Sequence, residues 1–183
     1  MEVAMGSRYK AVLCSAAELT LLALHTAISI GATLARIAAR NWDLAAVEHA
    51  AEQAAAHLIA RAVETTGDPD PNPRYPGIDF TRVPVLGIRA HRRADALIID
   101  VWDTDPTPPN PVSLDEHMAA MAVLARRWAT YPAQCGGKVI WAEIAGPPHH
   151  PAAPAAVHPL QPQACLAVVA NADNAAAYVE RPA

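Results

Sequence analysis

The sequence predicts an α+β domain, a two-layer α/β sandwich whose sheet is mostly antiparallel and whose helices lie on one face. Two observations carry this prediction. Helix-like and strand-like patterns come in separate blocks, two helices first and then a pair of strands, rather than in strict alternation. The two strands of that pair are joined by a turn far too short for a parallel crossover. The length of 183 residues suits one domain with a sizeable core.

The first half of the chain predicts two helices. Residues 19–24 form a short apolar run, which periodicity alone does not assign to a strand or a helix. Residues 26–40 then carry apolar side chains at helical spacing. Asp43 is expected to cap a second helix over residues 44–65, because a short polar side chain can accept from the first free amides. Gly67 is expected to end that helix.

The middle of the chain predicts a β-hairpin. The proline-rich stretch 68–73 has the composition of a loop, and residues 80–90 alternate loosely between polar and apolar. Residues 97–102 are short, bulky and β-branched, which is typical of a buried strand. Arg92 to Asp95 supply a tight polar turn, so the two runs are expected to pair.

A third helix and a last strand follow. Ser113 is expected to cap the helix, with Glu116 completing a capping box. The expected apolar face of this helix runs as far as Trp128. Gly136 and Gly137 then turn the chain into a strand over residues 139–144.

The composition predicts three segments: an N-terminal extension at 1–17, one folded domain at 18–146, and a Pro/Ala-rich C-terminal tail at 147–183. Within that tail, the apolar run 166–169 is a candidate for docking on the domain. Glu18 and His25 interrupt the apolar stretch 11–34, which argues against a membrane span or a signal peptide. Three widely spaced cysteines fit a reducing compartment, so we expect a cytoplasmic protein.

Charge and motif content exclude several classes of function. The formal net charge is −4 and no basic cluster stands out, so we expect no direct nucleic-acid binding. His149, His150 and His158 lie in a proline-rich segment without a cysteine or acidic partner at ligand spacing, so no metal site is expected.

Two stretches carry a family resemblance. Residues 99–109 read Ile-Asp-Val-Trp-Asp-Thr-Asp-Pro-Thr-Pro-Pro, and residues 136–144 read Gly-Gly-Lys-Val-Ile-Trp-Ala-Glu-Ile. A helix-like segment ending at Trp128 lies between them. This arrangement resembles the C-terminal half of bacterial GHKL (Bergerat-fold) ATPase domains, of the anti-sigma-factor serine kinase type. The likeness covers roughly residues 18–144.

The resemblance implies a nucleotide pocket in which Asp103 accepts a hydrogen bond from the adenine amino group. The family has glycine two residues later, where this chain has Asp105. Pro109 matches the motif's later proline, and Lys138 after the Gly-Gly turn is a candidate phosphate contact. Read without the resemblance, Asp103 and Asp105 are simply turn-capping residues after a strand.

The helix residues depart from the family pattern. The family has Glu and, four residues later, Asn on one helix face, for activating the attacking group and for holding Mg²⁺. The matching positions here are His57 and Arg61. Arginine only donates hydrogen bonds and cannot ligate a cation. His57 could act as a base, but a His and an Arg on a solvated helix face need no catalytic role.

The segment that would form the phosphate lid also departs from the family pattern. The family places a Gly-x-Gly segment at the start of the third helix, where backbone amides hold the phosphates. No glycine occurs between Gly87 and Gly136, and the matching place holds Asp115 and Glu116. Two carboxylates at this position would repel phosphate.

We therefore expect a non-catalytic or weakly nucleotide-binding regulatory protein of the anti-sigma/partner-switching type, a pseudoenzyme that acts by protein binding. No cofactor is expected, and the departures argue against ATP. Expected partners are a sigma factor, an anti-anti-sigma-like protein or a helix-turn-helix regulator, and the apolar N-terminal region would suit a homodimer. The alternatives are an active ATP-dependent serine kinase using His57, and a pocket repurposed for another ligand with Asp103 and Arg61 as its polar anchors.

Overall fold

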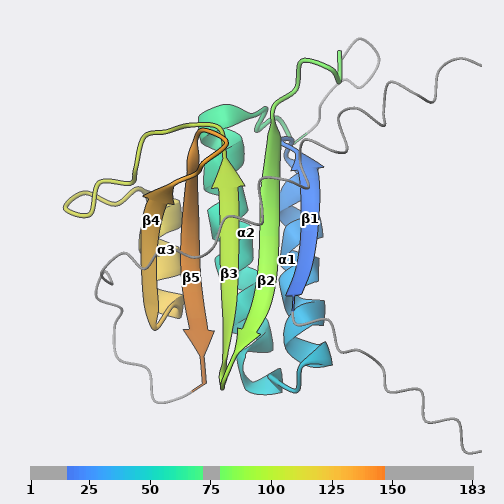
Figure 1. Ribbon diagram of the computed structural model, residues 1–183, viewed down its shortest axis with the longest axis vertical. Coiled ribbons are helices and arrows are strands. Elements are labelled where there is room, and N and C mark those ends of the chain that lie inside the picture. Colours follow the sequence, from blue (N-terminus) through green and yellow to red (C-terminus); the bar gives the residue numbers. More distant parts are fainter. Residues whose placement is uncertain (1–15, 72–78, 147–183) are drawn as a thin grey trace, which may run out of the picture.

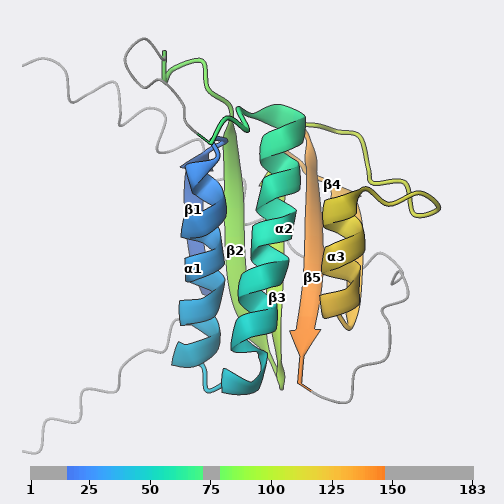
Figure 2. The same ribbon diagram turned by 180° about the vertical axis from the view of Figure 1, so that it is seen from behind.

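The computed structural model describes residues 16–71 and 79–146. It is an α+β fold with a five-stranded sheet in the order β1-β2-β3-β5-β4, in which every neighbouring pair is antiparallel. Figure 1 looks onto the sheet face that no described helix covers, and Figure 2 shows the helices α1, α2 and α3 along the opposite face. The predicted α+β class, the antiparallel sheet and the helices on one face are therefore confirmed for this part of the chain.

The elements follow the predicted order, with one strand added. The strands are β1 (Ala16–Leu22), β2 (Val85–Arg93), β3 (Ala96–Asp103), β4 (Arg127–Pro132) and β5 (Lys138–Ala145). The helices are α1 (Thr26–Asn41), a 3-10 turn at Ala45–Val47, α2 (Glu48–Thr66) and α3 (Glu116–Leu124). The ambiguous run at 19–24 thus belongs mainly to an edge strand, which starts two residues before the predicted domain boundary.

The predicted hairpin is present as β2 and β3. Arg93 pairs with Ala96, so Ala94 and Asp95 form a two-residue turn. Ala94 has a φ of 52°, the left-handed conformation that tight hairpin turns need. The hairpin places the apolar side chains of Ile88 and Val101 opposite each other on the helix-covered face.

Small residues let the two long helices lie close to each other and to the sheet. Buried alanines face the interior from both helices, and a Cβ on Gly31 of α1 would lie 2.0 Å from Ile59 Cδ1 of α2. Leu58, Ile59 and the apolar residues of β2 and β3 fill the space between the layers. The core is aliphatic, as the low aromatic content of 5% indicates.

The third helix is shorter than predicted and is capped by another residue. Asp115, not Ser113, is its N-cap, and the Asp115 carboxylate accepts from the Met118 amide at 2.8 Å. The helix ends at Leu124, because Ala125 is extended and the Arg126 amide donates to Glu143 O of β5. Trp128 is buried as predicted, but it lies on β4, the strand that sequence analysis missed.

Asp43 does not cap the second helix as predicted. It has a φ of 58° and lies in the connection after α1, while a 3-10 turn precedes α2. The start of α2 at Val47 has no side-chain cap. Gly67 does end α2, and a Cβ there would lie 1.9 Å from Ala23 O, so this close approach requires glycine.

Candidate functional site

The first charged cluster lies at the end of the sheet where β3 stops and β5 begins. Asp103 is the last residue of β3 and pairs directly with Lys138, the first residue of β5. Lys138 Nζ donates to Asp103 Oδ1 at 2.7 Å. Both residues are 1% exposed, so a complete ion pair is buried inside the domain.

The loop after β3 completes the coordination of the lysine. Lys138 Nζ also donates to the carbonyl oxygen and to Oδ2 of Asp105, each at 2.9 Å. An ammonium group has three donors, and all three are used here. The Asp105 amide in turn donates to Asp103 Oδ1 at 2.9 Å, and the Thr107 amide donates to Asp105 Oδ1 at 3.0 Å. The predicted turn-capping role of both aspartates is thus present together with the ion pairs.

The pKa values of the two carboxyl groups shift in opposite directions, because burial and nearby charge affect them to different extents. Burial raises the pKa of Asp103 above its ordinary value, although Lys138 and the Asp105 amide oppose that rise. Partial burial also acts to raise the pKa of Asp105, but hydrogen bonds from Lys138 and Thr107 outweigh it and leave that pKa below the ordinary value. The single charge of Lys138 is therefore shared between two carboxylates, one buried and one partly exposed.

Gly137 makes this arrangement sterically feasible. Its φ is +76°, and a Cβ at this position would lie 1.9 Å from Asp103 O. Glycine therefore lets the turn before β5 approach the end of β3, which brings Lys138 alongside Asp103. Gly136 also has a positive φ, of 91°, but no atom lies within 4 Å of its would-be Cβ.

The second charged cluster lies between α2 and α3. Arg61 Nε donates to Asp115 Oδ2 at 2.7 Å, and the other oxygen of Asp115 caps α3. Only 9% of the Arg61 side chain is exposed, against 46% for Asp115. The Nη1 atom of Arg61 is buried without a hydrogen-bond partner. Partial burial acts to raise the pKa of Asp115, but the Met118 amide and Arg61 outweigh it and lower that pKa.

Next to this ion pair, two histidines and a glutamate form a hydrogen-bonded chain. His117 Nε2 lies 3.0 Å from Glu64 Oε1, and His117 Nδ1 lies 3.3 Å from His57 Nδ1. A carboxylate only accepts, so His117 Nε2 carries the proton in that contact. Neutral His117 then has a bare Nδ1, which accepts from Nδ1–H of His57. This assignment leaves His57 Nε2 as the unprotonated nitrogen.

The environment of His57 favours its neutral form. Burial lowers the pKa of His57, and the nearby His117 lowers it further, while Glu116 acts weakly in the opposite direction. If both rings were doubly protonated, two N–H groups would point at each other across 3.3 Å. His57 therefore resists taking up a second ring proton.

The structure brings some of the predicted site residues together and separates others. Asp103, Asp105 and Lys138 form one cluster, while His57 and Arg61 share a face of α2 but contact α3. Among the described residues, no hydrogen bond or ion pair is recorded between these two clusters. Pro109 is buried in the loop after β3, without a polar contact to either cluster.

Sequence analysis missed three members of the second cluster: Glu64, Asp115 as cap and ion-pair partner, and His117. Glu64 lies seven residues after His57, so helical spacing placed both on one face of α2. No sequence signal placed His117 beside them, because it arrives on a separate helix through tertiary packing.

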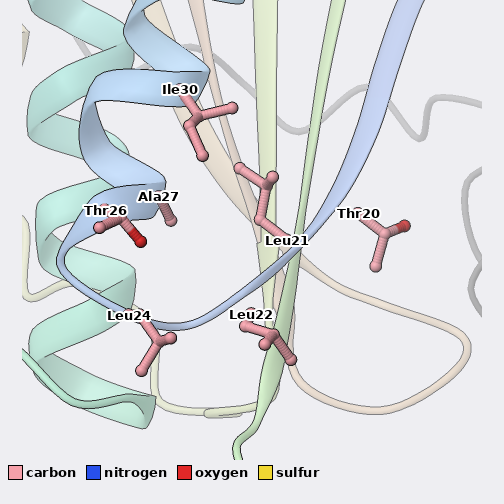
Figure 3. A pocket seen from close by; sticks show the side chains of 7 residues that line it. All are labelled: Thr20, Leu21, Leu22, Leu24, Thr26, Ala27 and Ile30. Carbon is pink, nitrogen blue, oxygen red and sulfur yellow. The ribbon is translucent and has the colours of Figure 1, made fainter. Parts of the chain in front are cut away.

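A pocket of about 230 Å³ lies apart from both clusters, where β1 leads into α1. Figure 3 shows its seven lining side chains, with Leu21 of β1 close to Ile30 of α1. The lining is almost entirely aliphatic, with Thr20 and Thr26 as its polar members. This pocket offers no charged group for a phosphate or a carboxylate.

Residues 16–71 and 79–146 offer neither a metal-binding group of side chains nor a membrane-spanning helix. Within those ranges, no group of three or more His, Cys, Asp or Glu side chains is placed to hold a metal ion. No helix there combines the length and apolar character needed to cross a bilayer. His149, His150 and His158 lie outside the described residues. No protein-family model matches the chain, and no curated protein matches it.

Proposed function

We propose that this protein is a non-catalytic regulatory domain of the anti-sigma/partner-switching type, built on a degenerate GHKL-like scaffold and acting in the cytoplasm through protein binding. The observation that carries the proposal is the state of Asp103. The residue that would accept from adenine is already bonded to Lys138 at 2.7 Å and to the Asp105 amide at 2.9 Å.

Both described hydrogen bonds to Asp103 are accepted by Oδ1, and burial separates the rest of the carboxylate from solvent, so adenine would have to open the packing around this ion pair to reach it. The carboxylate is 1% exposed, and Lys138 beside it has no other described acidic partner than Asp105. Displacing either bond would leave a buried charge without compensation, which is strongly unfavourable. The ion pair therefore substitutes for the ligand that the resembled family binds.

The second cluster supports the same conclusion for Mg²⁺ and phosphate. Arg61 stands where the resembled family has its metal-binding asparagine, and its guanidinium is bonded to Asp115. Asp115 and Glu116 stand at the start of α3, where the family's glycine lid would hold phosphates. Arg61 would repel a bound Mg²⁺, and the carboxylates of Asp115 and Glu116 would repel a bound phosphate.

The candidate protein-binding surface lies on α1 and β1, away from α3 and its charged cluster. Ile30 and Ile37 of α1 are exposed by 45% and 47%, and they lie seven residues apart on one helix face. Leu19 of β1 is 37% exposed in the neighbouring sheet layer, and among the described strands β1 pairs with β2 alone, so its other edge faces no described strand. An apolar helix face next to an open strand edge suits a protein partner or a second copy of this chain.

Titration of the protein with Mg-ATP tests the first half of the proposal. We expect no binding heat in isothermal titration, for the wild type and for Asp103→Asn alike. Micromolar binding in the wild type that disappears in Asp103→Asn would contradict it.

Affinity purification from the native host tests the second half. We expect the wild-type protein to retain a defined partner, and Ile30→Glu combined with Ile37→Glu to lose it. Val123→Glu is the matched control, because Val123 is 79% exposed on α3, on a different helix. Light scattering on the same three proteins separates a heterologous partner from self-association. Equal partner recovery with all three proteins would contradict the proposed surface.

One observation favours the enzymatic alternative. His57 is oriented by His117, and His117 by Glu64, which leaves His57 Nε2 unprotonated and able to act as a base. A divergent serine kinase would use His57 in this way. Phosphate transfer from ATP to a co-purified partner, abolished by His57→Gln, would establish that alternative and exclude the non-catalytic function.

A further inference from the structure

The sheet has an outer face, the one opposite the helices, and no described helix or strand lies over it (Figures 1 and 2). Strand alternation assigns the side chains on this face, since the helix-covered side chains of each strand are known. The outer face has apolar and charged side chains side by side in its centre, because Trp141 pairs with Asp100 and Ile98 pairs with Glu143. Its apolar residues are Ile98, Trp102, Ala129, Tyr131, Val139 and Trp141.

The two central strands are nevertheless buried on both faces. Every residue of β5 is buried, and so is every residue of β3 except Trp102. On the outer face, Ile98 is only 2% exposed and Trp141 only 5%. Apart from Asp100 in β3 and Glu143 in β5, the interiors of both strands are apolar, which is typical of strands that are covered on both sides.

Unpaired polar atoms on the same face point to the chemistry of the missing cover. Four buried side-chain atoms there have no hydrogen-bond partner: Trp141 Nε1, Asp100 Oδ1, Arg127 Nε and His91 Nδ1. His91 Nδ1 lies 3.4 Å from Asp100 Oδ2, but without hydrogen-bond geometry. Buried polar groups in folded proteins nearly always have partners. A covering peptide would supply main-chain carbonyls and amides as well as apolar side chains.

We propose that the apolar run at residues 166–169 docks on this outer face, as an intramolecular cover over Trp141 and Ile98. The run reads Leu-Ala-Val-Val in a Pro- and Ala-rich surrounding. It follows β5, whose last residue is Ala145 and which lies between β3 and β4. The chain therefore leaves the domain at the end of a central strand, where Ala145 pairs with Ala96.

The linker is long enough for this segment to reach the face, and its position favours it over the other end of the chain. Residues 147–165 span up to roughly 60 Å when extended, at about 3.3 Å per residue. The eight-residue β5 is roughly 27 Å long, so the linker reaches every point of the face. Residues 1–15 lead into β1, an edge strand separated from β5 by β2 and β3. The inference is independent of the proposed regulatory function.

Nuclear magnetic resonance on the full-length protein tests the proposal. The indole N–H signal of Trp141 is assigned from its loss in Trp141→Phe. We expect nuclear Overhauser contacts from this indole to the methyl groups of Leu166 or Val168. In Leu166→Asp combined with Val168→Asp, we expect those contacts to vanish and hydrogen exchange of the Trp141 indole to speed up at least tenfold.

The matched control is Ala155→Asp combined with Ala156→Asp, which adds the same charge to the same C-terminal segment. We expect this control to behave like the wild type. Unchanged indole exchange in the 166/168 variant would overturn the proposal, as would contacts from Trp141 to residues 1–15. A sample that mixes labelled and unlabelled protein identifies contacts between two copies, and contacts seen only between copies would also overturn it.

Discussion

The two charged clusters differ in how deeply they are buried. The Asp103–Lys138–Asp105 cluster joins two central strands and excludes solvent from its ion pair. The α2/α3 cluster pairs a buried Arg61 with a half-exposed Asp115 and ends at the exposed Glu64. The first cluster is therefore a structural element of the sheet, while Asp115 and Glu64 of the second cluster remain exposed to solvent.

The largest expected effect comes from removing the cation of the buried cluster. Lys138→Met leaves Asp103 buried without compensation, so we expect the free energy of unfolding to fall by about 3–5 kcal/mol. Urea denaturation of the full-length protein measures it. The double variant Lys138→Met/Asp103→Leu removes both charges and should recover part of the loss. A loss below about 1 kcal/mol in the single variant would show that Asp103 is hydrated or protonated instead.

Next in size is the effect of crowding the turn that brings the two strand ends together. Gly137→Ala adds a Cβ 1.9 Å from Asp103 O at a φ of +76°. Gly136→Ala has the same kind of backbone strain but no neighbour within 4 Å. We expect about 1–2 kcal/mol of destabilisation for Gly136→Ala, from the left-handed backbone alone. Gly137→Ala should be clearly worse in the same denaturation assay, and equal losses would contradict the close approach.

In the second cluster, the expected losses are smaller because the carboxylate is half exposed. Asp115→Ala removes the cap of α3 and the partner of Arg61, so we expect destabilisation of about 1–2 kcal/mol. Asp115→Asn keeps a side-chain oxygen for the cap but loses the charge, and should lie between Asp115→Ala and the wild type. If Asp115→Asn is as unstable as Asp115→Ala, the charge and not the cap dominates.

The smallest expected effect is a pH dependence that belongs to the second cluster alone. The pKa of His57 in the folded protein lies below the ordinary value of 6.5. Between these two values the unfolded chain binds more protons than the folded one, so His57 contributes stability that is complete above pH 6.5 and declines as pH falls. The urea midpoint of His57→Gln should therefore decrease less than that of the wild type between pH 7.5 and 5.5.

His49→Gln is the control for this pH dependence, because His49 is exposed in the first turn of the same helix. We expect it to keep the wild-type decline. A His57→Gln protein that declines as steeply as the wild type would contradict the role assigned to His57.

Sequence alone was sufficient wherever local patterns decide the structure. Helical spacing around Ile30 and Leu58 placed α1 and α2, and the β-branched run at 97–102 placed β3. A polar turn between two strand-like runs was enough to predict their hairpin. Asp103 and Asp105 were correctly expected to form a capped turn, since Asx turns depend on neighbouring residues only.

Helical periodicity also misled where a longer-range interaction outweighed it. The spacing from Met118 to Trp128 continues an apolar helix face, but pairing with β5 ends the helix at Leu124 and makes Trp128 part of β4. Burial of Trp128 was predicted correctly, because the side chain would face the core from the predicted helix as it does from β4. The cap at Asp115 was missed because Ser113 has the commoner capping signature.

The sequence by itself determined the α+β class, the antiparallel hairpin, the helix-covered core and the absence of glycine between Gly87 and Gly136, because each depends on composition or local spacing. Only the tertiary structure decided that Lys138 neutralises Asp103, that Asp115 engages Arg61, and that His117 orients His57. Those contacts join residues 35, 54 and 60 positions apart. Their partners are selected by strand register and helix packing, which no local pattern encodes.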